Sequence, residues 1–139
     1  MRCALALGFQ AGRMEAGHRR AYTILDTVQG VVVEPARQAR EQFGDNVAVY
    51  EYNLGGNGKS QILATTGFIK LVQQKDGPVV GIHMVGARIG ELIGEAQLIV
   101  GWEAYPEDVA PMVHGHPSQY EAMGEAMLAM AGKPLHVHD

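Results

Sequence analysis

This sequence holds almost no cysteine, few aromatic residues and no long hydrophobic run. Cys3 is the single cysteine among 139 residues, so the chain can form neither an internal disulfide nor a redox-active cysteine pair. A reducing, cytoplasmic setting is therefore the expected one. No apolar run reaches the roughly 18 residues that a membrane span needs. Residues 1–12 show no cleavage pattern, so a signal peptide is not expected either.

Positive charge is also scarce. Lysine and arginine number 11 against 15 acidic residues, which leaves a net charge of -4. Because no basic stripe runs along any segment, the charge pattern argues against a nucleic-acid surface. What the chain does have is 47% hydrophobic and 19% charged residues, a balance typical of a folded protein. Its length suits one domain with a real core.

From about residue 37 onward, local patterns predict a sheet. Residues 37–43 have the features of a short helix, which Gly44 would end. Alternating, β-branched and aromatic residues predict strands over 47–52, 68–72 and 79–85. An Asp-Gly turn at 75–78, suited to positive φ, joins the last two strands into a hairpin. These strands are therefore expected to form an antiparallel sheet.

Helical patterns follow the strands. An apolar stripe at helical spacing predicts a helix over 89–100, and Pro106 opens a second, short helix. A last helix is predicted over 119–131, closed by Gly132. The predicted fold class is α+β, an antiparallel sheet covered by helices on one face.

The first 36 residues show no such order. Glycine and arginine are scattered there without a period, apart from a candidate strand over 28–33 that Pro35 would end. We expect residues 1–36 to be a separate N-terminal segment, disordered or loosely attached. The domain itself is expected to span residues 37–135, with 136–139 as a C-terminal tail.

The strongest candidate for chemistry is the motif His116-Pro117-Ser118-Gln119-Tyr120-Glu121. Histidine changes charge near neutral pH, and a carboxylate in the first turn of a helix can orient its ring. The pair His116 and Glu121 is therefore a candidate acid/base pair on a rigid element. Ser118 and Glu121 also fit a capping box, in which each side chain accepts from the other residue's backbone N–H. Local chemistry alone favours the capping interpretation.

The Gly-rich segment 53–60 is a near match to a phosphate-binding P-loop. Its Gly-Lys-Ser ending fits, but Asn53 stands where the first glycine belongs. The segment 61–67 is also too short for the helix that would receive the phosphate. A small phosphate- or nucleotide-binding protein, with Lys59 in its site, is therefore the weaker alternative function.

Two His-x-His pairs could bind a transition metal. One is His114 with His116, and the other is His136 with His138, followed by Asp139. Imidazole and carboxylate are suitable ligands, but the second pair lies on the tail, where weak adventitious binding is favoured. No metal site is predicted from either pair.

The other distinctive side chains are expected to serve packing. His83 lies on a predicted strand and is interpreted as a core histidine. Trp102 and Tyr105 end the long helix and are interpreted as packing anchors. A methionine face on the last helix favours a core or interface over a sulfur ligand site; its members are Met123, Met127 and Met130.

Several segments, taken in order, resemble one known family. They are residues 50–54, 66–71, 81–87, 91–93 and above all 114–126. The stretch from about Gln38 to Leu135 resembles the C-terminal dimerisation (interface) domain of the pyridine nucleotide-disulfide oxidoreductases, most of all the dihydrolipoamide dehydrogenases. His-Pro-Ser-x-x-Glu matches the family's His-Pro-Thr-x-x-Glu, and Ser118 keeps the hydroxyl group.

The resemblance implies a sheet flanked by helices at the two-fold interface of an obligate homodimer. It implies that His116 is the acid/base of the partner subunit's active site, where it serves the dihydrolipoyl dithiol and the cysteine nearest the flavin. Glu121 would orient His116, and backbone at His116 and Pro117 would lie near the partner's flavin. FAD and NAD are the cofactors of the full-length family. A full-length subunit, and through it a 2-oxo acid dehydrogenase complex, are the implied partners.

The chain also departs from that family. It has no G-x-G-x-x-G after a strand and no C-x-x-x-x-C, the motifs of the flavin or nicotinamide sites and of the redox cysteines. We therefore expect an incomplete oxidoreductase that binds neither cofactor alone, a truncated or frame-disrupted product with a join near residue 37. At residues 31–36 the family's first strand is expected to be missing or replaced. The non-enzymatic alternative is a homodimerisation module.

Overall fold

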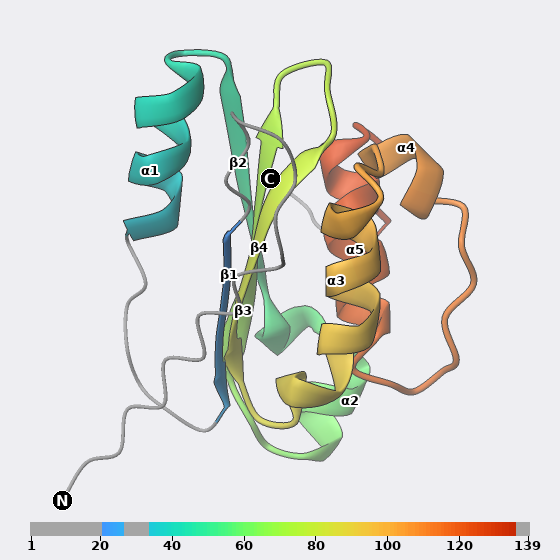
Figure 1. Ribbon diagram of the computed structural model, residues 1–139. Coiled ribbons are helices and arrows are strands. Elements are labelled where there is room, and N and C mark those ends of the chain that lie inside the picture. The colour runs from blue at the N-terminus through green and yellow to red at the C-terminus, as the bar shows by residue number, and fades with distance from the viewer. Residues whose placement is uncertain (1–20, 27–33, 136–139) are drawn as a thin grey trace, which may run out of the picture.

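One four-stranded sheet with helices on both faces forms the structure, a computed structural model that describes residues 21–26 and 34–135 (Figure 1). In chain order the elements are β1 (Ala21–Asp26), α1 (Glu34–Phe43), β2 (Val47–Asn53), the 3-10 helix η1 (Leu54–Gly56), α2 (Gly58–Ile62), β3 (Gly67–Gln74), β4 (Val79–Gly86), the 3-10 helix η2 (Ile89–Leu92), α3 (Ile93–Gly101), α4 (Pro106–Val109) and α5 (Glu121–Met130). The α+β fold class predicted from the sequence is confirmed.

The three predicted strands form the antiparallel part of the sheet. The strand order is β1-β4-β3-β2, with β2–β3 and β3–β4 antiparallel. The hairpin between β3 and β4 turns at Asp76, whose φ is +56°. An Asp-Gly turn tolerates that conformation, so this local prediction is confirmed.

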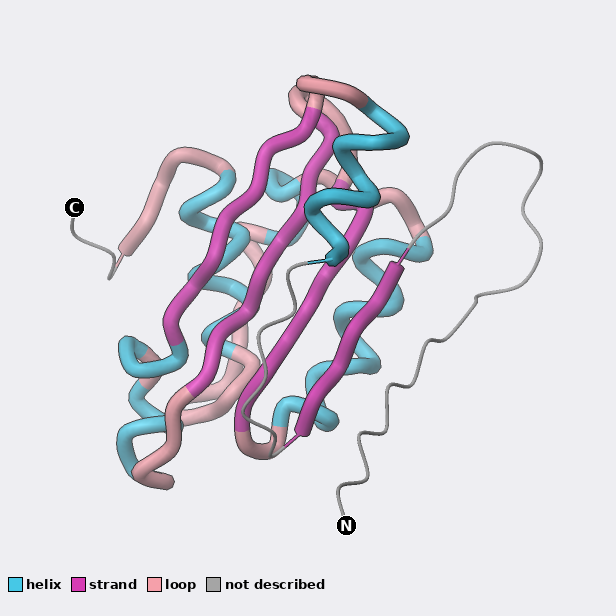
Figure 2. Tube along the Cα trace, turned by 90° about the vertical axis from the view of Figure 1, so that its left-hand side faces the viewer, coloured by secondary structure: helices cyan, strands magenta, loops and turns pink. Residues whose placement is uncertain are grey.

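The fourth strand, β1, was not predicted. It pairs in parallel with β4, with Ala21 opposite Gly81 and Asp26 opposite Gly86, and it lies at the edge of the sheet (Figure 2). A parallel partner strand is not joined by a local turn, so no short-range sequence pattern predicts the pairing. Part of the segment assigned to the region before the domain therefore joins the sheet. The strand predicted over 28–33 lies outside the described residues.

Helices cover both faces of the sheet rather than one. Helix α1 packs on the face opposite to α3 and α5, in front of the strands in Figure 2. Strand β4 is buried along nearly all of its length, because its side chains point alternately into two covered layers. The prediction that helices cover one face is therefore wrong for α1, whose position depends on packing rather than on local pattern.

The main core fills the layer between the sheet and the helices α3 and α5. Its largest fully buried side chains include Ile69, Leu71, Ile82, Met84, Leu92, Met123 and Met127. Met123 and Met127 confirm the packing interpretation of the methionine face, and Met130 packs partly buried beside them. Trp102 is 78% exposed and Tyr105 is also exposed, so their interpretation as packing anchors of this chain's own core is wrong. In the described part of the chain, no helix combines the length and apolar character needed to cross a bilayer.

His83 is fully buried on β4, as the sequence predicted. It stands opposite Lys70 of β3, and its Nδ1 has no hydrogen-bond partner among the described residues. Burial, together with the positive charge of Lys70, lowers the pKa of His83 from its ordinary value of 6.5 to about 4. A neutral imidazole is therefore built into the sheet.

This buried histidine predicts a loss of stability in mild acid. The unfolded chain binds a proton at His83 between pH 6.5 and about 4 while the folded chain does not, so stability rises with pH in that window. The free energy of unfolding is unaffected by His83 well above pH 6.5. As pH falls toward 4, it decreases by up to about 3 kcal/mol, because the unfolded chain gains a proton that the folded chain cannot take up. Urea unfolding of the natural chain and of His83→Gln across this range should show the steeper pH dependence in the natural chain. Parallel curves would contradict the prediction.

Candidate functional site

His116 and Glu121 are in direct contact at the start of α5. The Nδ1 atom of His116 lies 2.8 Å from Oε1 of Glu121, across a loop whose His116–Pro117 peptide bond is cis. The His116 side chain is 78% exposed and that of Glu121 only 27%. The carboxylate thus holds one edge of a ring whose other edge faces solvent.

Only half of the predicted capping box forms. The backbone N–H of Ser118 donates to Oε2 of Glu121 at 2.8 Å, as predicted. The Ser118 hydroxyl is buried and has no hydrogen-bond partner among the described residues. A capping box requires Glu121 at the third helical position, whereas α5 begins at Glu121 itself. The Ser118 half of that prediction is therefore wrong.

The carboxylate of Glu121 is held in its charged form. Burial raises the pKa of Glu121, but the hydrogen bonds from the Ser118 N–H and from His116, with the charges of His116 and His114, outweigh it and lower that pKa overall. An anionic acceptor at Nδ1 favours the tautomer in which Nδ1–H donates to Glu121. The lone pair of Nε2 is then available to take up a proton.

A second histidine–glutamate pair lies beside the first. The Nε2 atom of His114 lies 2.7 Å from Oε1 of Glu95, on α3. The two side chains are 12% and 19% exposed, so this pair is far more enclosed than that of His116. Reasoning from the sequence missed the partnership, because no spacing rule links residues 19 positions apart.

The histidine pairs do not gather a metal-binding cluster in the described chain. His114 and His116 each contact a different glutamate. Within residues 21–26 and 34–135, no group of three histidine, cysteine, aspartate or glutamate side chains is placed to hold a metal ion. The other candidate pair, His136 and His138, lies outside those ranges.

The Gly-rich segment 53–60 supports the loop that carries His116. Asn57 caps the five-residue helix α2 by accepting from the Ser60 N–H, and its Nδ2 donates to the carbonyl of Ser118 at 3.1 Å. The Ser60 hydroxyl donates to Oε1 of Gln119 at 2.9 Å. Both Asn57 and Ser60 are buried. Their polar groups therefore attach the segment to residues 118–119.

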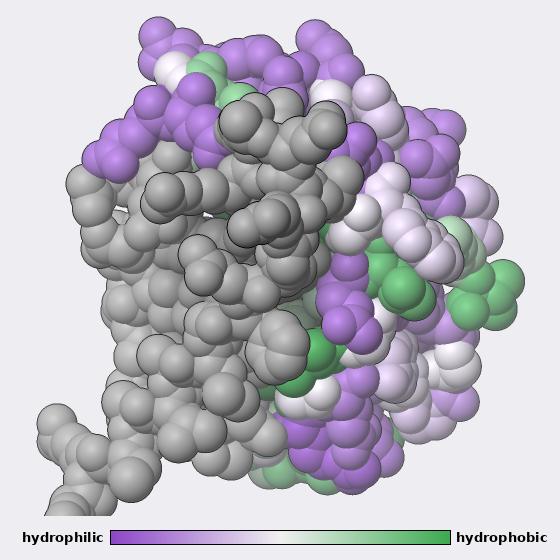
Figure 3. Space-filling model, viewed as in Figure 1, coloured by the Kyte–Doolittle hydropathy of each residue, from purple (hydrophilic) through white to green (hydrophobic). Residues whose placement is uncertain are grey.

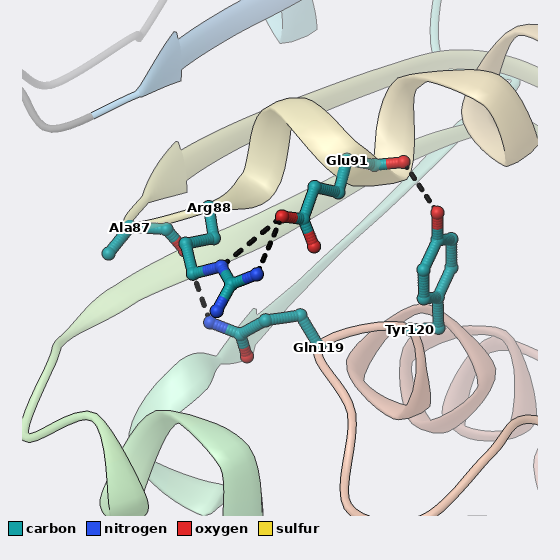
Figure 4. A network of polar contacts seen from close by, with 5 residues as sticks. All are labelled: Ala87, Arg88, Glu91, Gln119 and Tyr120. Atoms are coloured by element: carbon teal, nitrogen blue, oxygen red, sulfur yellow. Dashed lines mark hydrogen bonds and ion pairs between the residues drawn. The ribbon is translucent and has the colours of Figure 1, made fainter.

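The same loop is attached on its other side to the connection between β4 and α3 (Figure 4). Gln119 Nε2 donates to the carbonyl of Ala87 at 3.1 Å, and the Tyr120 hydroxyl donates to the carbonyl of Glu91 at 2.7 Å. That connection is in turn braced by the ion pair of Arg88 with Glu91 at 2.9 Å. None of these contacts was predicted. They fix the start of α5, and with it Glu121, against two separate parts of the fold.

Comparison with known proteins gives one family. The pyridine nucleotide-disulphide oxidoreductase dimerisation domain matches residues 30–127. A dihydrolipoyl dehydrogenase of Bacillus subtilis is 36% identical over 95 residues, 67% of this chain and 20% of that protein. The mitochondrial dihydrolipoyl dehydrogenase 2 of Arabidopsis thaliana is 34% identical over 122 residues, 81% of this chain and 24% of that protein. A dihydrolipoyl dehydrogenase of Corynebacterium glutamicum is 38% identical over 98 residues, 68% of this chain and 21% of that protein.

The chain therefore spans about a fifth to a quarter of the length of these relatives. The matched range 30–127 includes the residues of the site described above, from Asn57 to Glu121. It also begins upstream of about Gln38, where the sequence alone placed the start of the resemblance.

Proposed function

Because this chain belongs to the dimerisation-domain family of the pyridine nucleotide-disulphide oxidoreductases, we propose that it supplies His116 and Glu121 as an acid/base pair to a partner subunit's active site. One observation carries the proposal. His116 is held at Nδ1 by Glu121, yet most of its side chain faces outward. A base that served a pocket of its own chain would be enclosed by that chain, whereas this one can be covered by a second subunit.

In the proposed reaction His116 moves a proton. Its Nε2 takes the proton from a thiol of a dithiol substrate, because the thiolate is the form that attacks a disulfide sulfur. Glu121 keeps the ring oriented and stabilises the imidazolium that results. The relatives are named dihydrolipoyl dehydrogenase, so a dihydrolipoyl group is the proposed substrate. The thiolate attacks a disulfide of the partner subunit, and the sulfur that leaves as a thiolate takes the proton from the imidazolium, which restores the neutral ring.

The flavin of such an active site would be held by the partner. His116 and Pro117 are consecutive and both exposed, which fits a backbone contact to a group bound by another subunit. When bound, FAD supplies the acceptor for the reducing equivalents, and NAD receives them in turn. We expect the purified chain alone to show no flavin absorbance. Tight binding of FAD by this chain without a partner would contradict the proposal.

Exposed apolar side chains suit the association that the proposal needs. Those on α3, beyond its C-terminal end and in the loop after α4 are Leu98, Trp102, Tyr105, Met112 and Val113. Figure 3 shows hydrophobic residues among polar ones on this side of the molecule. Exposed apolar side chains that gather in one patch mark interaction surfaces. The same side chains favour the second candidate function, a homodimerisation module without a catalytic role.

Complementation of a full-length subunit tests the proposal. A full-length relative that lacks its own active-site histidine is mixed with this chain, and oxidation of dihydrolipoamide is followed after the mixed dimer is isolated. We expect turnover to return, and the Lys59→Ala variant to restore it equally, because the hydrogen bonds at His116 and Glu121 are made between these two side chains and the Ser118 N–H. Association without any turnover would contradict the catalytic role and leave the homodimerisation module. Nucleotide-dependent stabilisation that is lost in Lys59→Ala would instead favour the phosphate-binding alternative.

A further inference from the structure

The second pair, His114 with Glu95, takes no part in the proton transfer proposed above. We propose that His114 and Glu95 are positioning residues, a clamp between α3 and α5 that sets the direction of the His116 side chain. This inference rests on the proposed function, since it concerns the same active site. It assigns the two side chains a role that acts through His116 rather than on the substrate.

One end of the clamp is the bond to α3. His114 lies in the loop between α4 and α5, two residues before His116, and its Nε2 meets the Glu95 carboxylate at 2.7 Å. Both side chains are less than a fifth exposed. A hydrogen bond to a charged group is stronger than one between neutral groups, and more so where water is largely excluded. The bond thus ties the loop to a helix that is anchored in the core.

The other end of the clamp is the backbone of α5. A Cβ placed on Gly124 would lie 2.8 Å from Nδ1 and 3.1 Å from Cε1 of His114, so the imidazole rests directly against that glycine. The ring cannot move toward α5 without a clash, and any movement that lengthens the Nε2–Oε1 distance costs it the bond to Glu95. Gly124 is one turn beyond Glu121 on the same helix, so the clamp places His114 against the helix that carries the orienting carboxylate.

Only Gly115 separates the clamp from His116. A Cβ on Gly115 would meet nothing within 4 Å, so packing does not restrain this residue, and glycine has the widest choice of backbone conformations. Ser118 and Gln119 are fixed on the far side of His116 by Asn57 and Ser60. His114 is therefore the attachment on the near side. Without it, the chain just before His116 would be free to shift, because packing does not restrain Gly115.

The first test compares variants that remove the clamp with one that keeps it. Glu95→Ala and His114→Ala delete the bond, whereas Glu95→Gln retains an oxygen acceptor of the same reach. Nitrogen-15 NMR of the full chain reports on the Nδ1 hydrogen bond of His116. We expect its signal to broaden or shift in both alanine variants and to stay near that of the natural chain in Glu95→Gln. In the complementation assay, kcat should fall by about tenfold to a hundredfold in the alanine variants, with KM little changed, because a misplaced base slows the chemical step.

Gly124 gives an independent test. Gly124→Ala should displace the His114 ring and reproduce the NMR change at His116 while both His114 and Glu95 remain in the chain. In the His114→Ala background the added methyl group has room, so the double variant should show no further change in the signal or in kcat. Such non-additivity is the mark of residues that act as one unit.

Glu107→Ala serves as the control, since Glu107 lies exposed on α4; it should alter neither readout. An unchanged His116 signal and unchanged kcat in folded Glu95→Ala, His114→Ala and Gly124→Ala would overturn the clamp. The NMR measurement needs no partner subunit. If the natural chain restores no turnover, the proposed function fails, while the NMR comparison still decides whether His114 and Glu95 position His116.

Discussion

Replacing His116 with glutamine is expected to abolish the turnover that this chain restores to a histidine-deficient partner. General acid–base catalysis by a positioned side chain contributes about 10²- to 10⁴-fold, and glutamine cannot take up the proton. The residual rate should fall within that range below the natural chain, measured as dihydrolipoamide oxidation by the isolated mixed dimer. The loss should appear in kcat, because the base acts in the chemical step. The variant should fold as the natural chain does, since the exposed His116 side chain contributes little to stability.

Glu121→Gln provides the matched comparison. Its amide oxygen can still accept from Nδ1–H of His116, but it lacks the charge that stabilises the imidazolium. We therefore expect an intermediate rate, between those of the natural chain and of His116→Gln. Both variants should form the mixed dimer as the natural chain does. Full turnover with His116→Gln in a proven mixed dimer would rule out His116 as the base.

The largest effect on stability is expected from Gly67→Ala, at the first residue of β3. The φ angle of Gly67 is +156°, and an added Cβ would lie 2.0 Å from the carbonyl oxygen of Val85 and 2.8 Å from the Cα of Gly86. These obstacles are backbone atoms of the neighbouring strand, so the β3–β4 ladder would have to separate locally. The free energy of unfolding should fall by about 4 kcal/mol or more, the range reached when a special backbone site is destroyed.

Gly94→Ala is the control for this prediction. Gly94 lies in α3, and a Cβ there would meet nothing within 4 Å, so alanine should be neutral or stabilise the helix by up to about 1 kcal/mol. Urea unfolding followed by circular dichroism measures both variants. Similar midpoints for Gly67→Ala and the natural chain would contradict the prediction.

Much of the sheet could be predicted from local pattern. Alternation and the β-branched and aromatic residues predict the strands β2, β3 and β4, and the Asp-Gly pair predicts the turn at Asp76. Such signals arise within a few residues, where side-chain period and turn geometry act. Strand β1 shows the limit of this reasoning, because its partner β4 lies more than 50 residues further along the chain.

The site divides in the same way. His116 and Glu121 are five residues apart, so a helix start is enough to bring them together, and the structure places them in contact. Their role in catalysis stays a proposal. The capping prediction went wrong at Ser118 because the exact first residue of α5 depends on how the loop is attached, through Gln119 and Tyr120, to Ser60, Ala87 and Glu91.

The sequence by itself determined the α+β class, the hairpin of β3 and β4, and the proximity of His116 to Glu121. Each of these depends on backbone period or on hydrogen bonds that reach only a few residues. Tertiary structure alone decided that His114 meets Glu95, that Ser60 meets Gln119 and that α1 covers the second face of the sheet. These pairs are brought together only when the sheet and helices bury their apolar sides against one another, and that burial is a property of the whole chain.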